Sequence, residues 1–320
     1  MSKVFVTGAN GFIGSHVVEA LLSAGHSVHA FCEYNSNGSF GWLDGFTHPE
    51  LSFVLGDVRD AGSVERAMEG TDCTAHLAAL IAIPYSYVAP RSYIDTNVTG
   101  TMNVLEAARK YGHSNVVVTS TSEVYGTPDS VPIHESHELK GQSPYSATKI
   151  AADKLAEAWA KSFELPVLIL RPFNTYGPRQ SFRAVIPTII GQLLLGPSLQ
   201  LGSLETKRDF TYVADTALAF VRAIESAVEP GTVIQLGTGR TVSVADVVRI
   251  VSDQLGIVPE LELSEERLRP AASEVQILLS DPKRAKEQLG WTASTSLEDG
   301  LAKSISWMKE NRRTIDRYVI

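Results

Sequence analysis

The fold is decided by the stretch Thr7-Gly8-Ala9-Asn10-Gly11-Phe12-Ile13-Gly14. It follows a strand-like run and opens a helix-like segment, so its three glycines lie in the turn between them. Glycine lets the backbone turn tightly and lets a pyrophosphate approach the helix N-terminus, where free N–H groups and the helix dipole favour negative charge. A glycine triplet at the start of a βαβ pattern predicts a dinucleotide site. Asn10, Phe12 and Ile13 are predicted to line that site beside Gly8, Gly11 and Gly14.

Short β-branched runs alternate with helix-like segments over the first two-thirds of the chain. This pattern is typical of a parallel sheet covered on both faces. Strands are predicted at Lys3–Thr7, Ser27–Phe31, Leu51–Leu55, Cys73–Leu77, Asn115–Ser120 and Pro166–Leu170. Helices are predicted at Phe12–Ala24, Ser63–Met68, Tyr93–Lys110 and Tyr145–Phe163. The fold class is therefore α/β, a Rossmann-like doubly wound parallel sheet.

The alternation of strand-like and helix-like segments ends at Gly177, where a proline-, glycine- and arginine-rich stretch begins. Further elements are predicted at Ala184–Leu195, Asp209–Val213, Ala214–Ser226, Thr232–Leu236, Val244–Leu255, Pro282–Leu289 and Leu297–Lys309. We expect residues 1–175 to form the NAD(P)-binding domain, with 210–240 returning to it through a strand at Thr232–Leu236. We expect 176–209 and 241–320 to form a smaller C-terminal lobe that binds the substrate.

Composition narrows the classes of function. The 320 residues are 44% hydrophobic and 20% charged, as in an ordinary globular enzyme. A net charge of −8 without a lysine or arginine block disfavours nucleic acid and anionic membranes as partners. No apolar run is long enough to span a bilayer and no signal peptide is recognisable, so a cytoplasmic protein is predicted. The two cysteines predict no disulfide framework, and the histidines lack clustered carboxylates, so no metal site is predicted.

Two later segments agree with a dinucleotide site. Asp57 follows a strand-like run and precedes Val58, where an aspartate can accept a hydrogen bond from an adenine amino group. Leu77, Ala78 and Ala79 end the fourth strand, where small side chains let the backbone lie against a cofactor. Alternatively, Asp57 caps a helix or turn, and Ala78 and Ala79 are small only because of packing.

The choice between NAD and NADP depends on Glu33, near the spacing at which a carboxylate binds the adenosine ribose. No arginine or lysine occurs from residue 4 to residue 58 to pair with a 2′-phosphate. NAD is therefore favoured, and NADP stays open as the alternative. Glu33 could equally be a solvated loop residue, because the strand alignment puts Cys32 where the acidic residue most often occurs.

A phenol and an ammonium lie four residues apart in Tyr145-Ser146-Ala147-Thr148-Lys149, on one face of a predicted helix. A tyrosine pKa near ~10 must fall by roughly three units for base catalysis near neutrality, which needs about 4 kcal/mol. An ammonium ~4 Å away supplies about 4 kcal/mol at an effective dielectric of ~20. A catalytic role for Tyr145 and Lys149 is favoured because Ser120-Thr121-Ser122-Glu123 follows the fifth strand, where these side chains can reach the same reacting carbon.

With these motifs the whole sequence resembles the extended short-chain dehydrogenase/reductase family of NAD-dependent nucleotide-sugar epimerases and dehydratases. The matching motifs are Gly8-x-x-Gly11-x-x-Gly14, Asp57-Val58, Asn97-Val98-x-Gly100-Thr101, Ser120-Thr121-x-Glu123-Val124-Tyr125-Gly126, Tyr145-x-x-x-Lys149, Arg171-Pro172-Phe173-Asn174-x-Tyr176-Gly177-Pro178 and Arg208-Asp209-Phe210-x-Tyr212-Val213. The resemblance implies that Thr121 binds the sugar hydroxyl being oxidised, Tyr145 removes its proton and Lys149 holds the nicotinamide ribose. It also implies a nucleotide-diphosphate sugar as substrate, bound by Asn174, Arg179 and Arg208, with Ser86, Arg183 and Arg269 as further candidates.

Glu123 discriminates between the reactions of this family. A 4,6-dehydratase must remove the C5 proton, and Glu123 can be that base, whereas 4-epimerases usually lack the carboxylate. Ser122 stands where dTDP-glucose dehydratases have an aspartate, and Ser-Glu resembles GDP-mannose 4,6-dehydratases and UDP-glucuronate decarboxylases. The alternative for Glu123 is a turn cap, and for Arg183 and Arg269 surface ion pairs.

Longer segments resemble LegB-type 4,6-dehydratases of nucleotide-linked N-acetylglucosamine, at residues 78–87, 141–149 and 266–270. A 4,6-dehydratase is therefore predicted, with Ser122 and Glu123 among its catalytic residues. A decarboxylase, a 4-epimerase and a non-catalytic NAD(P) or sugar-nucleotide sensor are the alternatives. Apolar residues on more than one face of the helices predicted at Tyr93–Lys110 and Tyr145–Phe163 predict a two-fold homodimer built on a four-helix bundle.

Overall fold

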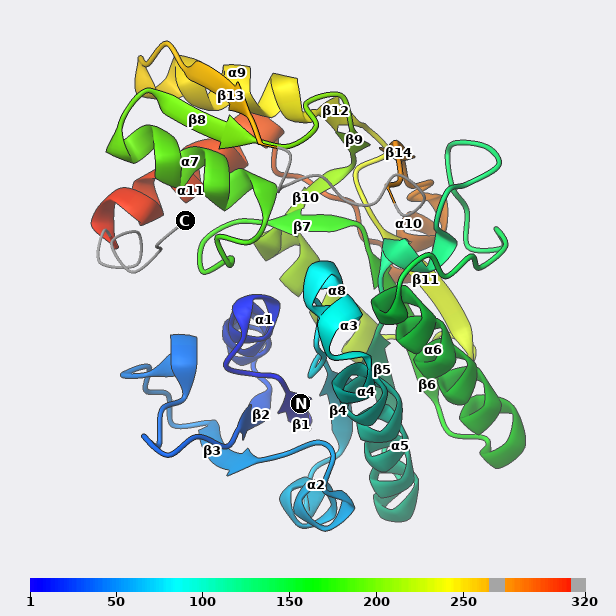
Figure 1. Cartoon of the computed structure of the whole chain (residues 1–320). Helices are drawn as coiled ribbons and strands as arrows, with labels where there is room; N and C mark the ends of the chain where they lie inside the picture. The colour runs from blue at the N-terminus through cyan, green and yellow to red at the C-terminus, as the bar shows by residue number, and fades with distance from the viewer. Residues whose placement is uncertain (265–273, 312–320) are drawn as a thin grey trace.

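A computed structural model describes residues 1–264 and 274–311, and its centre is a seven-stranded parallel sheet (Figure 1). The strand order is β11-β6-β5-β4-β1-β2-β3, and every neighbouring pair is parallel. The strands are β1 (Lys3–Thr7), β2 (Ser27–Glu33), β3 (Leu51–Gly56), β4 (Cys73–His76), β5 (Asn115–Thr119), β6 (Val167–Pro172) and β11 (Thr232–Leu236). The doubly wound α/β sheet expected from the sequence is thus present.

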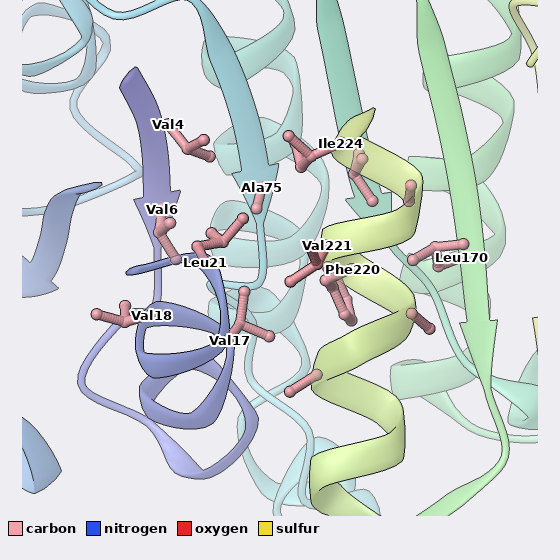
Figure 2. Close-up of a cluster of buried hydrophobic side chains, with 14 of the residues drawn as sticks. Val4, Val6, Val17, Val18, Leu21, Ala75, Leu170, Phe220, Val221 and Ile224 are labelled. Atoms are coloured by element: carbon pink, nitrogen blue, oxygen red, sulfur yellow. The ribbon is translucent and has the colours of Figure 1, made fainter. Parts of the chain in front are cut away.

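Apolar side chains cover both faces of the sheet. On one face, Val4 and Val6 of β1 belong to a buried cluster with Leu21 of α1 (Phe12–Ser23) and Phe220 of α8 (Val213–Glu225), drawn in Figure 2. On the other face, a second cluster joins the sheet to α2 (Ala61–Met68), α5 (Gly100–Tyr111) and α6 (Pro144–Phe163). Because both faces are buried, the strands carry nearly continuous apolar runs.

The strand order reverses between β1 and β4. From β1 the chain proceeds outward through β2 and β3, then crosses back to β4 and continues through β5, β6 and β11 on the other side. Such a reversal leaves a crevice at the carboxyl ends of the two central strands, where doubly wound proteins bind their ligands. Thr7 and His76 end these two strands and are paired in register.

A separate cluster of buried side chains lies beyond the carboxyl edge of the sheet. It contains side chains from α7 (Val185–Leu195), α9 (Val244–Leu255) and α11 (Leu297–Glu310). Small sheets surround it: β8 (Ser198–Leu201) pairs with β13 (Glu260–Leu263), β7 (Asn174–Tyr176) with β10 (Phe210–Tyr212), and β9 (Lys207–Arg208) with β12 (Val242–Ser243) and β14 (Ile277–Leu278). Helix α10 (Lys283–Leu289) packs against β11 and α8.

Several of these elements were not predicted. Two- and three-residue strands such as β9 and β14 have no room for a period-two pattern, so the sequence carries no signal for them. The short helices α3 (Ile83–Val88) and α4 (Pro90–Tyr93) and the 3-10 turn Gly41–Leu43 are too brief for a helical period. The predicted helix Tyr93–Lys110 is interrupted, because residues Ile94–Thr99 form a π-helix before α5 begins.

Candidate active site

The glycine-rich turn packs against the end of the neighbouring strand. Gly8 has φ of +64°, and a Cβ there would lie 2.8 Å from the Ala78 nitrogen. A Cβ on Gly14 would lie 2.0 Å from the Gly8 carbonyl oxygen. Ser15 donates the first intrahelical hydrogen bond of α1 to Gly11 at 3.0 Å, so the preceding N–H groups point out of the helix end. These close approaches leave a cradle that fits the pyrophosphate of a dinucleotide.

Leu77 and Ala78 are held beside this turn by the Thr7 hydroxyl, which also contacts a buried histidine. The Thr7 hydroxyl accepts hydrogen bonds from the Leu77 and Ala78 nitrogens, both at 3.1 Å, and lies 2.7 Å from His76 Nδ1. His76 Nε2 lies 3.0 Å from the Thr101 hydroxyl, which donates to Asn97 O. His76 therefore carries its proton on Nε2. Burial lowers the pKa of His76 to about 3, which keeps the ring neutral.

Glu33 and Asp57 lie at neighbouring strand ends. Glu33 is exposed and is paired in register with Gly56, the residue before Asp57. The Asp57 carboxylate accepts hydrogen bonds from Arg59 Nε at 2.9 Å and from the Arg59 backbone, and these bonds lower the pKa of Asp57. Arg59 lies just past the stretch free of basic residues, and sequence reasoning missed it. Val58 is buried against Gly100, where a Cβ would lie 3.0 Å from its methyl group.

Asn97 joins the cofactor side to the helix that carries Tyr145. Its side chain bonds both the nitrogen and the oxygen of Leu80, at 2.9 and 3.0 Å, and donates to the Thr148 hydroxyl at 3.1 Å. Thr148 in turn donates to Tyr145 O. Asn97 lies in the π-helical segment, a distortion that often marks functional sites. It was quoted in a motif, but its role became visible only in the structure.

Tyr145 and Lys149 lie on the same face of α6, as the four-residue spacing predicted. Ser143 begins the helix through a capping box with Ser146. Tyr145 packs edge-on against Tyr93, with ring centroids 6.3 Å apart, and its side chain is hydrogen-bonded to Thr121. Burial raises the pKa of Tyr145, and the hydrogen bond from Thr121 opposes that rise. The lowering expected from Lys149 is therefore absent in the protein alone.

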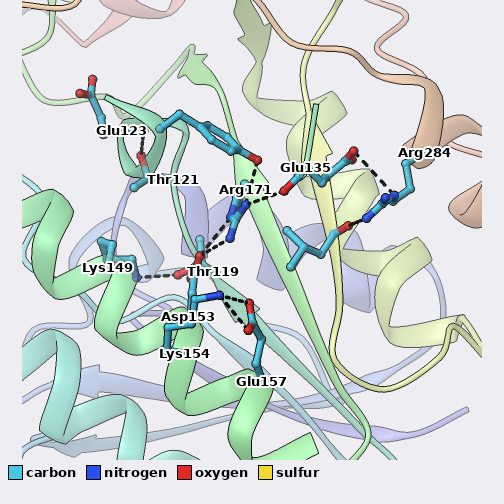
Figure 3. A network of polar contacts seen from close by, with 12 residues as sticks. Thr119, Thr121, Glu123, Glu135, Lys149, Asp153, Lys154, Glu157, Arg171 and Arg284 are labelled. Atoms are coloured by element: carbon cyan, nitrogen blue, oxygen red, sulfur yellow. Dashed lines mark hydrogen bonds and ion pairs between the residues drawn. The ribbon is translucent and has the colours of Figure 1, made fainter. Parts of the chain in front are cut away.

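Lys149 is almost fully buried. Its ammonium donates to Thr119 O at 2.6 Å (Figure 3). Burial lowers the pKa of Lys149 to about 8, and the negative charge of Asp153 opposes that fall. The Lys149 ammonium is thus directed toward the end of β5, and in this arrangement it does not lower the pKa of Tyr145.

Thr121, Ser122 and Glu123 follow β5 and form the start of a 3-10 turn, Ser122–Tyr125. The Thr121 hydroxyl accepts a hydrogen bond from the Glu123 nitrogen at 3.2 Å and so caps the turn. Ser122 is buried, Glu123 is half-buried, and the Glu123 charge acts on Tyr145. The structure therefore brings together all five predicted catalytic residues.

The predicted substrate-binding residues are less uniform. The Asn174 side-chain oxygen is buried and has no hydrogen-bond partner among the described residues. Arg183 is exposed, and its charge acts on Tyr93, next to Tyr145. Ser86 is fully buried, and its hydroxyl donates to Ile83 O of its own helix at 2.7 Å, so its role in substrate binding stays a prediction. Arg269 lies outside the described residues.

Two of the predicted arginines are paired within the protein. Arg179 has φ of +70° and bonds Glu19 of α1 at 2.6 Å, while its Nη1 is buried without a hydrogen-bond partner among the described residues. Arg208 is buried and pairs with Glu274 at 2.9 Å. Ligand binding at either guanidinium would therefore compete with a carboxylate or share it.

Asp209 supports the arginine beside it. This fully buried carboxylate accepts hydrogen bonds from the nitrogen and hydroxyl of Thr238, the Gly239 nitrogen, and the nitrogen and hydroxyl of Ser280. Its backbone oxygen also accepts from the Asn174 nitrogen at 3.1 Å. Asp209 thus fixes the relative positions of Arg208 and Asn174, a function that no local pattern indicates.

Other kinds of site are not found in the part of the chain that the structure describes. Residues 1–264 and 274–311 contain no group of three or more histidine, cysteine or acidic side chains arranged for a metal ion. Within the same ranges, every helix is too short or too polar to cross a lipid bilayer.

Known proteins share this arrangement. The family model described as GDP-mannose 4,6 dehydratase matches residues 5–304. A dTDP-glucose 4,6-dehydratase of Actinoplanes sp. is 31% identical over 97% of this chain and 98% of its own. A UDP-glucose 4-epimerase of Mycolicibacterium smegmatis is 32% identical over 96% and 98%. The structure of a dTDP-glucose 4,6-dehydratase from Streptomyces venezuelae with NAD bound superposes with a TM-score of 0.88, 31% identity and 98% coverage of both chains.

Proposed function

The chain belongs to the GDP-mannose 4,6 dehydratase family of sugar-nucleotide dehydratases and epimerases, and from this premise we propose that it is an NAD-dependent nucleotide-sugar 4,6-dehydratase. The observation that carries the proposal is Glu123, a carboxylate half-buried beside Thr121 whose charge acts on Tyr145. Dehydration requires a base for the C5 proton, whereas epimerisation at C4 does not. Glu123 stands where such a base is needed.

In the proposed reaction, each predicted catalytic residue has a separate step. Tyr145 accepts the proton of the C4 hydroxyl, which the Thr121 hydroxyl orients. Glu123 removes the C5 proton once C4 is a ketone, because the carbonyl makes that proton acidic. Glu123, or a water held by Ser122, then protonates the departing C6 hydroxyl. Loss of water leaves a C5–C6 double bond, and return of the hydride to C6 with addition of a solvent-derived proton to C5 would give a 4-keto-6-deoxy sugar nucleotide.

The cofactor fits the turn formed by Gly8, Gly11 and Gly14, because without Cβ atoms this turn closes against Ala78 and leaves the N–H groups at the start of α1 open to a pyrophosphate. When bound, NAD would supply the hydride acceptor at C4 and the hydride donor at C6. Asn10, Phe12, Ile13, Glu33, Asp57, Val58, Leu77, Ala78 and Ala79 would surround it. Lys149 would bind the nicotinamide ribose, and its ammonium would lower the Tyr145 pKa that burial raises.

The substrate is proposed to be a nucleotide-diphosphate N-acetylglucosamine. Asn174, Arg179, Arg183 and Arg208 would supply the donors for the diphosphate oxygens. The Nη1 of Arg179, buried and without a hydrogen-bond partner among the described residues, supports this role. The N-acetyl group rests on the resemblance of residues 78–87 and 141–149 to LegB-type dehydratases.

A 4-epimerase is the second candidate. It is favoured by the 32% identity to the Mycolicibacterium smegmatis epimerase and by Ser122, which cannot act as a second carboxylic acid for the C6 hydroxyl. In that case Glu123 would only orient Thr121, and no solvent proton would enter the product.

One experiment separates the two. Purified protein is incubated with UDP-, GDP- and dTDP-linked glucose and N-acetylglucosamine in deuterated water. A dehydratase gives a product lighter by one water that carries deuterium at C5, measured by mass spectrometry and NMR. An isomer of unchanged mass without C5 deuterium contradicts the dehydratase and supports the epimerase. Glu123→Gln should oxidise C4 and stall, so that reduced cofactor accumulates.

We also propose a homodimer through α5 and α6. Ile94, Met102 and Phe163 are large apolar side chains on these helices or just before them, and they are 46%, 38% and 41% exposed. Burying them against a second copy would remove this apolar surface from water. Light scattering at micromolar concentration should give the dimer mass, and a monomer would contradict the proposal.

A further inference from the structure

Arg171 is a buried arginine beneath the candidate active site. It lies on β6, and only 2% of its side chain is exposed. Its guanidinium donates from Nε and Nη2 to Asp153 Oδ2 at 3.0 and 2.9 Å, and from Nη1 to the Tyr125 hydroxyl at 2.9 Å (Figure 3). The guanidinium carbon also lies 5.1 Å from the Tyr125 ring centroid. One cation thus binds two separate segments.

These segments carry the two halves of the catalytic group. Asp153 lies on α6, four residues after Lys149 and eight after Tyr145. Tyr125 lies in the 3-10 turn that Thr121 caps and that contains Glu123. The side-chain hydrogen bond between Thr121 and Tyr145 connects the segments a second time. Any movement of Arg171 would therefore change the distance between the sugar-oxidising residues and Glu123.

Asp153 also faces the charge of Lys149. Both residues are buried on the same helix face, and a buried ammonium needs an opposite charge nearby. The other titratable or charged groups that act on Lys149 or Asp153 are His76 on β4, which burial keeps neutral, Arg171 on β6, and the phenols of Tyr125 and Tyr145. Asp153 is the carboxylate that raises the pKa of Lys149.

We propose that Arg171 and Asp153 are positioning residues that hold the Thr121–Glu123 turn at a set distance from Tyr145 and keep Lys149 protonated during sugar oxidation. The Arg171 guanidinium stabilises the Asp153 anion, and the anion stabilises the Lys149 ammonium. Neither residue touches the substrate. The inference rests on the proposed function only for its first step, the oxidation of C4, which dehydratases and epimerases share.

The charge relation, in which the Asp153 anion stabilises the Lys149 ammonium, is tested by Asp153→Asn, which keeps the shape of the side chain. The rate of reduced-cofactor formation in a single turnover is measured against pH, with the sugar nucleotide that the enzyme accepts. Lys149 should lose its proton sooner as the pH rises, so the alkaline limb of the profile should move down by about one unit or more. Because this readout precedes dehydration, it survives if the enzyme proves to be an epimerase.

The matched control is Glu157→Gln. Glu157 lies on the same helix, and its exposed partner Lys154 is 2.9 Å away, so the change also converts a carboxylate to an amide. Its pH profile should coincide with that of the wild type. A slower Asp153→Asn enzyme with an unshifted alkaline limb would overturn the charge relation. An equal shift in Glu157→Gln would overturn its specificity.

The positioning relation, in which Arg171 holds the Thr121–Glu123 turn relative to Tyr145, needs a separate test. Tyr125→Phe removes the hydroxyl that binds Arg171 and leaves Asp153 in place, so sugar oxidation should slow several-fold with no displacement of the alkaline limb. In the cofactor-free chain, the stability losses of Tyr125→Phe and Asp153→Asn, measured by denaturant unfolding, should be non-additive because both act through Arg171. Wild-type oxidation by Tyr125→Phe, or additive stability losses, would overturn it.

Discussion

The cofactor end and the substrate end of the crevice are built in opposite ways. At the cofactor end, eight consecutive residues form the cradle, and its shape depends on atoms that glycine lacks: a Cβ on Gly14 would lie 2.0 Å from Gly8 O. At the substrate end, side chains from distant segments meet, and their charges are already paired, as in Arg179 with Glu19 and Arg208 with Glu274. The first end is fitted to a cofactor by its shape, whereas under the proposed function Arg179 and Arg208 would have to exchange a carboxylate for the substrate diphosphate.

The largest effect is expected from breaking the cofactor cradle. Gly14→Ala forces a methyl group into the Gly8 carbonyl, and because backbone blocks it we expect a loss of about 3 kcal/mol of stability and of measurable NAD binding. Denaturant unfolding and fluorescence titration with NAD are the measurements. Gly25→Ala, in the turn after the same helix, meets no atom within 4 Å, and although its φ of +87° makes the change cost some stability, NAD binding should be retained. Normal NAD affinity in Gly14→Ala would contradict the shape argument.

A change between the two ends should stop the chemistry and leave both binding sites intact. Tyr145→Phe deletes the proton acceptor but keeps the ring packed edge-on against Tyr93. Turnover should fall by roughly a thousandfold or more, with nearly unchanged affinity for NAD and for the sugar nucleotide. Calorimetry and product assays measure the two quantities. Activity near the wild-type level would remove Tyr145 from the mechanism.

Arg208→Ala should separate the two ends. It removes a guanidinium that can bind diphosphate oxygens and leaves Glu274 without that partner, so sugar-nucleotide affinity should fall by about 2–3 kcal/mol while NAD affinity stays constant. Isothermal titration with each ligand is the measurement, and Arg240→Ala, an exposed arginine nearby in the chain, is the control. If both affinities fall equally, the variant has lost its fold rather than its substrate site.

The smallest effect concerns the ion pair that links the two ends. Glu19→Gln releases Arg179, a partly exposed pair, so stability should change by less than about 1 kcal/mol. If Arg179 exchanges Glu19 for the substrate diphosphate, sugar-nucleotide affinity should rise a few-fold, because no partner has to be given up. Reduced affinity in titration would mean that the pair orients Arg179 for binding instead.

Local patterns predicted the elements that carry most of the site. The glycine turn was recognisable because Gly8, Gly11 and Gly14 lie within seven residues, and Tyr145 and Lys149 because four residues make one helical turn. Ser86 shows what such patterns leave out. Its identity suited a ligand, but only the fold reveals that its hydroxyl bonds Ile83 O inside the short helix α3.

The sequence by itself determined the parallel α/β sheet, the dinucleotide turn and the catalytic helix, because each depends on neighbours within a few residues along the chain. The tertiary structure decided which distant residues share a partner. Arg171 binds Asp153 and Tyr125, 18 and 46 residues away, and Asp209 accepts from Thr238 and Ser280, 29 and 71 residues away. No periodicity encodes such pairs, because buried charges select partners by position in space, after the sheet has brought their segments together.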